Sequence, residues 1–311
     1  MLYAAFQINC QNGGTEIILQ TIFTNFDTIL KRNEPLSAHS TMRTGGAAAL
    51  AAFPKSAEEL SALIDAARAE SMRYIVAGNG SNLLFDDDGF DGLVIFTTSM
   101  RRVEWRGQSV YAECGASLTG LAAEAVKRGL SGLEFSYGIP GTIGGAVYMN
   151  AGAYGSEISA VLTESIYLSE GTVKTRNLAE HAFGYRTSVY RKTGDIILSA
   201  EISLAKSDPA AISEKAKKNM ASRREKQPLE YPNAGSIFKR PEGAFPGALI
   251  EQAGLKGFRI GGAEVSEKHA NFIVNRGGAT SADVLRLIEH VQNEVQKQFG
   301  IALETEIIHI K

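Results

Sequence analysis

Apolar residues recur at the three- and four-residue spacing of amphipathic helices within residues 16–30, 55–71 and 282–299. Three further segments are also predicted to be helical. The clearest beginning is at Ser56, where a serine followed three residues later by Glu59 forms a capping box. Gly129 and Gly254 stand where a helix typically ends in the left-handed conformation. The predicted helices fall within residues 16–30, 55–71, 117–129, 205–228, 247–257 and 282–299.

Short apolar runs between these segments predict strands. They lie at residues 73–78, 92–98, 109–115, 165–168, 195–204 and 302–310. In the last run Glu304 and Glu306 are expected on the same side, because alternate residues of a strand share a face. Strands and helices do not alternate strictly, so the pattern favours an α+β fold over a doubly wound parallel sheet.

The length of 311 residues suggests two domains or three small ones, and the composition changes near residue 206, where a charged segment begins. We therefore expect three parts. They are a helical extension over residues 1–34, a larger domain over residues 35–206 and a smaller domain over residues 207–311.

The composition, 44% hydrophobic and 21% charged, is that of an ordinary globular protein. The formal net charge is −2, whereas a nucleic-acid-binding protein typically shows a basic excess, so no nucleic acid partner is expected. Cys10 and Cys114 are far apart in sequence and indicate neither a disulfide framework nor a metal site.

The apolar segment at residues 16–30 is too short to span a bilayer, and it contains Gln20, Asn25 and Asp27. It also lacks the basic face of a membrane-surface helix. The N-terminus has no charged start and no small-residue cleavage site of a signal peptide. We therefore expect a cytoplasmic protein without a membrane partner.

Two glycine-rich stretches carry candidate chemistry: "AGNGSNLL" at residues 77–84 and "GIPGTIGGAVYMNAGAYG" at residues 138–155. Backbone N–H groups in such turns bind anions and suit a pyrophosphate. Neither stretch is a G-x-G-x-x-G fingerprint or a P-loop. Tight turns in a close-packed core are the alternative, and the residues alone leave both interpretations open.

Other catalytic schemes find no support. The five histidines include no H-E-x-x-H pair, and no G-x-S-x-G nucleophile elbow occurs. The acidic run Asp86–Gly92 lacks the glutamate that closes a calcium-binding loop. We expect it to form a solvated turn.

Seven segments, taken in order, resemble one family. They are "MRTGGAAAL", "AGNGSNLLF", "GLEFSYGIPGTIGGAVYMNAGAYGSEI", "FGYRTSVY", "YPNAGSIFKRPEG", "LIEQAGLKGFRIGGAEVSEKHANFIVN" and "LETEI". The sequence over residues 35–311 resembles UDP-N-acetylenolpyruvoylglucosamine reductases, the flavoenzymes of peptidoglycan precursor synthesis. The compact interval from Arg186 to Ser236 is similar to the family's shorter type II form, which lacks a substrate-capping tyrosine loop.

The resemblance implies an FAD-binding domain of the vanillyl-alcohol oxidase (PCMH) type, followed by a smaller substrate-binding domain whose last strand returns to the active site. It implies FAD and NADPH as cofactors, UDP-N-acetylglucosamine enolpyruvate as substrate, and no obligate protein partner. It places the FAD pyrophosphate and ribityl chain against both glycine stretches. The matching residues are Asn79, Gly80, Ser81, Asn82, Gly138, Ile139, Pro140, Gly141, Thr142, Gly144 and Gly145, continued by Asn150, Ala151 and Gly152.

Three further matches imply the chemistry, in which hydride adds to the vinyl carbon and the adjacent carbon is then protonated. Arg186 matches the arginine that stabilises charge on the substrate carboxylate. Ser236 matches the proton donor, and Glu306 matches a carboxylate that polarises the intermediate, with Glu304 as its rival. Without the resemblance these residues indicate a strand-edge arginine, a turn serine and a solvent-facing glutamate.

Tyr185, Lys239 and Arg240 are candidates for binding the substrate diphosphate, although a solvated basic turn explains the last two as well. Asn233 and Ala248 depart from the family, which commonly has serine and lysine there.

Another flavin oxidase or dehydrogenase on the same scaffold is the main alternative function, because a fold does not determine a function. A catalytically silent module that binds a UDP-sugar is a second alternative.

Overall fold

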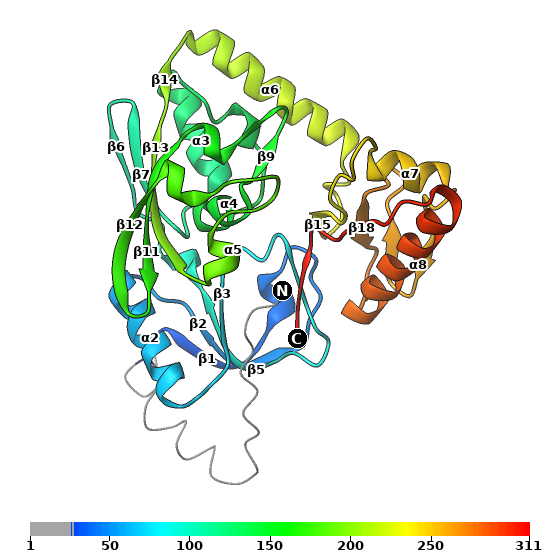
Figure 1. Cartoon of the computed structure of the whole chain (residues 1–311), viewed down its shortest axis with the longest axis horizontal. Coiled ribbons are helices and arrows are strands. Elements are labelled where there is room, and N and C mark those ends of the chain that lie inside the picture. Colours follow the sequence, from blue (N-terminus) through cyan, green and yellow to red (C-terminus); the bar gives the residue numbers. More distant parts are fainter. Residues whose placement is uncertain (1–25, 27) are drawn as a thin grey trace. The chain divides into compact units, whose positions relative to one another are not determined.

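The computed structural model describes residue 26 and residues 28–311, which separate into two compact units (Figure 1). The first unit contains residues up to 34, 48–78 and 91–216; the second contains residues 35–47, 79–90 and 217–311. Both units mix strands with helices, as expected for an α+β fold. Each unit is assembled from separate stretches of chain, which differs from the continuous division expected at residues 34 and 206.

The first unit contains two larger sheets. One has four strands in the order β1-β2-β5-β3, and the other is a five-stranded antiparallel sheet in the order β12-β11-β13-β7-β6. Their strands are β1 (Leu30–Pro35), β2 (Ala47–Ala52), β3 (Tyr74–Ala77), β5 (Phe90–Phe96), β6 (Val103–Arg106), β7 (Ser109–Glu113), β11 (Leu162–Ser169), β12 (Thr172–Asn177) and β13 (Ile196–Ser203). Two short pairs are β8 (Leu130–Ser131) with β14 (Ala205–Lys206) and β9 (Gly152–Ala153) with β10 (Ser156–Glu157).

The helices of the first unit follow the predicted pattern. Ser56 caps α2 by accepting a hydrogen bond from Glu59 N at 3.2 Å. The Glu59 carboxylate accepts from Lys55 N at 2.7 Å, so the second half of the predicted capping box is not formed with Ser56 N. The apolar face of the helix, from Leu60 to Ala67, is buried. Gly129 has a φ of +68°, as predicted for its position after a helix. The helices are α2 (Ala57–Ala69), α3 (Leu118–Lys127), α4 (Ile143–Met149), α5 (Tyr190–Thr193) and α6 (Pro209–Lys226), the last of which continues into the second unit.

The second unit is built on a four-stranded sheet in the order β15-β18-β17-β16. Helix α8 packs against α7 and against strands β17 and β16 (Figure 1). The apolar face predicted for the last helix is buried in α8, which Thr280 caps. The elements are β4 (Leu83–Phe85), β15 (Asn233–Ser236), α7 (Pro246–Gln252), β16 (Arg259–Ile260), β17 (Ala263–Val265), β18 (Phe272–Asn275), α8 (Ser281–Phe299) and β19 (Ile308–Ile310).

The acidic run Asp86–Gly92 is not simply a solvated turn. The carboxylate of Asp87 accepts hydrogen bonds from the backbone N–H groups of Ser281 and Ala282 at 2.7 and 2.9 Å. Asp86 pairs with His309 at 2.9 Å. The predicted turn is present, with Asp87 and Asp88 exposed. The sequence did not reveal the added contacts, because they join residues far apart in the chain.

Two predictions at the chain ends need correction. Most of the helix expected at residues 16–30 lies outside the described residues, but Leu30 already belongs to strand β1. The predicted closing strand is shorter than expected, because only Ile308–Ile310 pairs with β4. Among the described residues, no helix is long and apolar enough to cross a membrane.

A buried polar chain links β11 to α5 in the first unit. His181, Ser165 and Tyr190 are all fully buried. Because the carbonyl of Asn177 can only accept, His181 Nδ1 donates to it at 2.7 Å. In the neutral ring, Nε2 then accepts from the Ser165 hydroxyl at 2.7 Å, and Ser165 accepts from Tyr190 at 2.6 Å. Burial lowers the pKa of His181, so folding favours this neutral form.

We expect a change of His181 to Gln to flatten the loss of stability on acidification. Because the folded-state pKa of His181 lies below the ordinary value of 6.5, the unfolded chain binds its proton more readily. Stability from this group is therefore lost as the pH falls below that value. Between about pH 8 and about pH 5 the thermal unfolding temperature should fall more steeply for wild type than for H181Q. Equal declines would contradict a neutral buried His181.

Candidate functional site

The second glycine stretch contains a helix that its composition concealed. Thr142 caps α4, and its Oγ1 accepts a hydrogen bond from Gly145 N at 3.3 Å. The helix packs against β13 and β7. It ends at Asn150, which is fully buried and has a φ of +45°. Thr142 was the available signal, because threonine is a preferred N-cap residue.

Close packing explains several of the glycines. A Cβ added at Gly144 would lie 2.9 Å from Cys114 Cβ, and one at Gly78 would lie 2.3 Å from Thr142 Oγ1. A Cβ at Gly152 would lie 2.7 Å from the carbonyl oxygen of Ser156. The close-packed interpretation that the sequence left open is therefore correct at these positions.

The backbone N–H groups of this stretch divide into two sets. Those of Ile143, Gly144 and Gly145 donate to protein oxygens, at 2.9, 2.8 and 3.3 Å respectively. In the part of the chain that the structure describes, those of Gly138, Gly141 and Thr142 have no acceptor. The second set fits a bound pyrophosphate, because unpaired N–H groups in a glycine turn are suited to phosphate oxygens.

The first glycine stretch, which follows β3, leads into the second unit. Gly80 has a φ of +60°, and a Cβ there would lie 2.2 Å from the carbonyl oxygen of His39. Asn82 donates from Nδ2 to the carbonyl oxygen of Glu306 at 3.1 Å, and its own carbonyl accepts from Ile308 N at 3.0 Å. Asn82 thus fixes the segment that carries Glu306.

Ser236 and Glu306 lie on neighbouring segments of the second unit. Glu306 N donates to the carbonyl oxygen of Ile237 at 2.7 Å, and Phe238 forms an isolated bridge with Thr305. Ser236 is the last residue of β15 and follows Gly235, whose φ is +77°. The structure therefore brings the segments of these two predicted residues together, although they are far apart in sequence.

Asn271 holds this arrangement and was not predicted. It is 5% exposed; its Oδ1 accepts from Phe238 N at 3.0 Å, and its Nδ2 donates to Phe238 O at 2.9 Å. The backbone of Ile237 also donates to Asn271 O at 2.9 Å. The signal was a polar residue beside the apolar strand "FIV", which indicates a buried hydrogen-bonding role.

The predicted diphosphate ligands have partners of their own. Lys239 Nζ pairs with the carboxylate of Glu304, and the backbone N of Lys239 donates to Glu304 O at 2.9 Å. Arg240 lies over the ring of Phe245, with its Cζ 4.4 Å from the centroid. Glu304, the rival to Glu306, is therefore engaged as the counter-ion of Lys239.

Arg186 lies in the first unit at the tip of a tight turn. Gly184 and Thr187 exchange backbone hydrogen bonds at 3.1 and 3.2 Å, so Tyr185 and Arg186 are the two central residues. Arg186 has a φ of +55°, a left-handed conformation that costs a non-glycine residue about 1–2 kcal/mol. Its Nη2 donates to the carbonyl oxygen of Gly152 at 3.0 Å.

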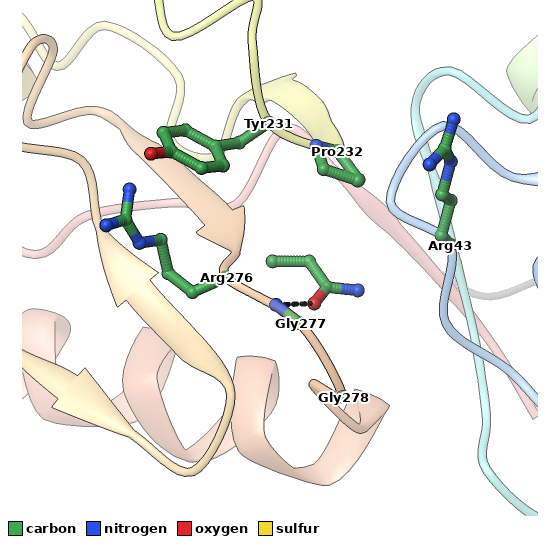
Figure 2. A pocket seen from close by; sticks show the side chains of 7 residues that line it. Arg43, Tyr231, Pro232, Arg276, Gly277 and Gly278 are labelled. Atoms are coloured by element: carbon green, nitrogen blue, oxygen red, sulfur yellow. Dashed lines mark hydrogen bonds between the residues drawn. The ribbon is translucent and has the colours of Figure 1, made fainter.

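A basic pocket of about 430 Å³ opens in the second unit (Figure 2). Asn275 organises it: Nδ2 donates to Met42 O at 3.1 Å, and Oδ1 accepts from Gly277 N at 2.9 Å. The Arg276 guanidinium lies 4.1 Å from the ring centroid of Tyr231. The lining residues are Arg43, Tyr231, Pro232, Asn275, Arg276, Gly277 and Gly278, none of which the sequence had predicted as a site.

Burial shifts the pKa of two further groups, the thiol of Cys114 and the imidazole of His269. Burial raises the pKa of the Cys114 thiol to about 12, so no thiolate forms near neutral pH. Burial lowers the pKa of His269, and its Nδ1 has no partner among the described residues. His269 is therefore neutral at physiological pH.

The chain is similar to known reductases along most of its length. Two family models match, "FAD binding domain" over residues 48–175 and "UDP-N-acetylenolpyruvoylglucosamine reductase, C-terminal domain" over residues 227–310. The UDP-N-acetylenolpyruvoylglucosamine reductase of Latilactobacillus sakei is 48% identical over 89% of this chain and 92% of its own. That of Caldanaerobacter subterraneus is 46% identical over 88% of this chain and 91% of its own. The crystal structure of the Thermus caldophilus reductase has a TM-score of 0.78 and 34% identity, and covers 91% of this chain and 98% of its own.

We expect Gly144→Ala to destabilise the protein, while Gly145→Ala does not. A methyl group at Gly144 meets Cys114, and overpacking of this kind costs about 1–3 kcal/mol. The nearest atom to a Cβ at Gly145 is Thr142 Oγ1 at 3.5 Å, an ordinary contact. Thermal unfolding of the two variants checks this. Equal unfolding temperatures would contradict the prediction and show that Cys114 moves to accommodate the methyl group. The FAD content of G145A measures separately whether the cofactor itself requires that glycine.

We also expect Arg186→Gly to be more stable than Arg186→Ala by about 1 kcal/mol, because only glycine adopts the left-handed conformation without strain. Denaturant unfolding of both variants provides the comparison. If the alanine variant were the more stable, the turn would not hold Arg186 in that conformation in solution.

Proposed function

Because this chain belongs to the family of UDP-N-acetylenolpyruvoylglucosamine reductases, we propose that it reduces UDP-N-acetylglucosamine enolpyruvate to UDP-N-acetylmuramate with NADPH as the electron donor. It is an oxidoreductase that carries FAD. The main support for the proposed mechanism is the backbone hydrogen bond between Glu306 and Ile237. It joins the segment of the proposed carboxylate, Glu306, to the segment of the proposed acid, Ser236. The backbone N–H groups of Gly138, Gly141 and Thr142 would hold the FAD pyrophosphate, and FAD would supply the hydride chemistry between NADPH and the vinyl carbon of the substrate.

Arg186 stabilises the negative charge that develops on the substrate carboxylate as hydride adds. A planar guanidinium matches a carboxylate through two parallel hydrogen bonds. The strained turn supports this role, since backbone strain concentrates where function requires a particular side chain. Preorganised charge stabilisation of this type is commonly the largest catalytic contribution.

Ser236 protonates the carbon next to the one that receives hydride. A serine hydroxyl is a weak acid, so its position must be well defined for proton transfer to compete with other fates of the intermediate. Two features support such a position. Gly235 holds a left-handed conformation just before Ser236, and Asn271 secures the next two residues from both sides.

Glu306 acts beside Ser236 by polarising the intermediate or by orienting the hydroxyl group. Its backbone is fixed from two directions, by Ile237 O and by the side chain of Asn82. Glu304 is less suited, because its carboxylate neutralises Lys239. The pairing of the Glu306 backbone with Ile237, next to Ser236, supports the assignment of Glu306.

Tyr185, Lys239 and Arg240 bind the substrate diphosphate in this scheme. Lys239 is paired with Glu304, so a phosphate oxygen would replace an exposed carboxylate as its partner. Arg240 is already held over Phe245, which limits the rotamer freedom that it loses on binding.

We expect Ser236→Ala to keep flavin reduction by NADPH and to slow flavin reoxidation by the enolpyruvyl substrate. Only the second half-reaction needs a proton on carbon, and the loss of a positioned acid slows such a step about 100-fold or more. Anaerobic stopped-flow absorbance measures both half-reactions in the same sample, so the first serves as the control. If both half-reactions kept wild-type rates, Ser236 would not be the proton donor.

A further inference from the structure

A second arginine holds the turn that presents Arg186. Arg191 Nη1 donates a hydrogen bond to the carbonyl oxygen of Arg186 at 2.9 Å. We propose that Arg191 is a positioning residue, which fixes the backbone of Arg186 so that its guanidinium is preorganised for the substrate carboxylate. The inference rests on the proposed role of Arg186.

The conformation of Arg186 needs such support. The third position of a turn with a positive φ normally holds glycine or asparagine, whereas here it holds an arginine at +55°. Relaxation to a negative φ would redirect the Cα–Cβ bond and move the guanidinium away from Gly152 O, which it contacts at 3.0 Å. A hydrogen bond to the carbonyl of Arg186 opposes this change, because it fixes the peptide plane that follows.

The helix that carries Arg191 is well anchored. It lies on α5, whose neighbouring residue Tyr190 is fully buried and bonded to Ser165 at 2.6 Å. A charged donor gives a stronger hydrogen bond to a carbonyl than a neutral donor does. The polar chain that begins at His181 therefore anchors the helix from which Arg191 reaches the turn.

The rest of the turn has its own anchors. Asn150 Nδ2 donates to Gly184 O at 3.1 Å, and Ser188 Oγ donates to Tyr148 O at 2.8 Å. Both bonds hold the ends of the turn and leave the carbonyl of Arg186 unconstrained. Loss of Arg191 should therefore keep the turn in place while it frees the conformation of the catalytic arginine.

The test compares Arg191→Met, Arg191→Lys and the control Lys192→Met, which removes the neighbouring cation of the same helix. For R191M we expect reoxidation by the enolpyruvyl substrate to slow about 30-fold, because small displacements of a catalytic group cost up to about 100-fold. Flavin reduction by NADPH should stay within about threefold of wild type. R191K retains a donor and should recover most of the loss, and K192M should match wild type in both half-reactions.

Product binding gives a readout apart from turnover. Calorimetry should show weaker binding of UDP-N-acetylmuramate, which carries the same carboxylate, to R191M than to K192M. Equal slowing of both half-reactions, an unchanged reoxidation rate, or no recovery in R191K would each contradict the proposal. If R191M does not fold, R191K decides: a partly slowed reoxidation with normal reduction supports positioning, whereas wild-type rates in both half-reactions or an equal loss in both contradict it. A wild-type enzyme that ignores the enolpyruvyl substrate would instead contradict the proposed function.

Discussion

The second unit depends on the pairing of the last chain segment with residues near position 82. Strand β19 lies parallel to β4. Where the chain enters β19, the side chain of Asn82 donates to Glu306 O and its backbone carbonyl accepts from Ile308 N. The same segment pairs with Ile237 through Glu306. One set of backbone hydrogen bonds thus joins three distant parts of the sequence, and the proposed acid and carboxylate depend on it for their positions.

The glycine-rich stretches combine two requirements that the sequence could not separate. At Gly144 and Gly78 the neighbouring protein atoms leave no space for a side chain. At Gly138 and Gly141 the backbone N–H groups have no acceptor among the described residues, which suits a phosphate group. The same composition therefore serves the packing of α4 in one part and anion binding in the other.

The sequence predicted those elements whose signals are local. The N-cap at Ser56, the apolar face of α8 and the glycines after α3 and α7 are all as expected, because each arises within a few residues. The discontinuous units, the contacts of Asp87 with α8 and the clamp at Asn271 were missed, since each joins segments far apart in sequence. The family resemblance supplied Arg186, Ser236 and Glu306, whose residue types alone indicate ordinary structural positions.

The most direct test of this account is the rate at which the purified flavoprotein oxidises NADPH with and without UDP-N-acetylglucosamine enolpyruvate. We expect oxidation that depends on the substrate and yields UDP-N-acetylmuramate, as identified by mass spectrometry. A protein whose flavin is reduced by NADPH but is not reoxidised by the enolpyruvyl substrate would keep the fold and contradict the proposed function.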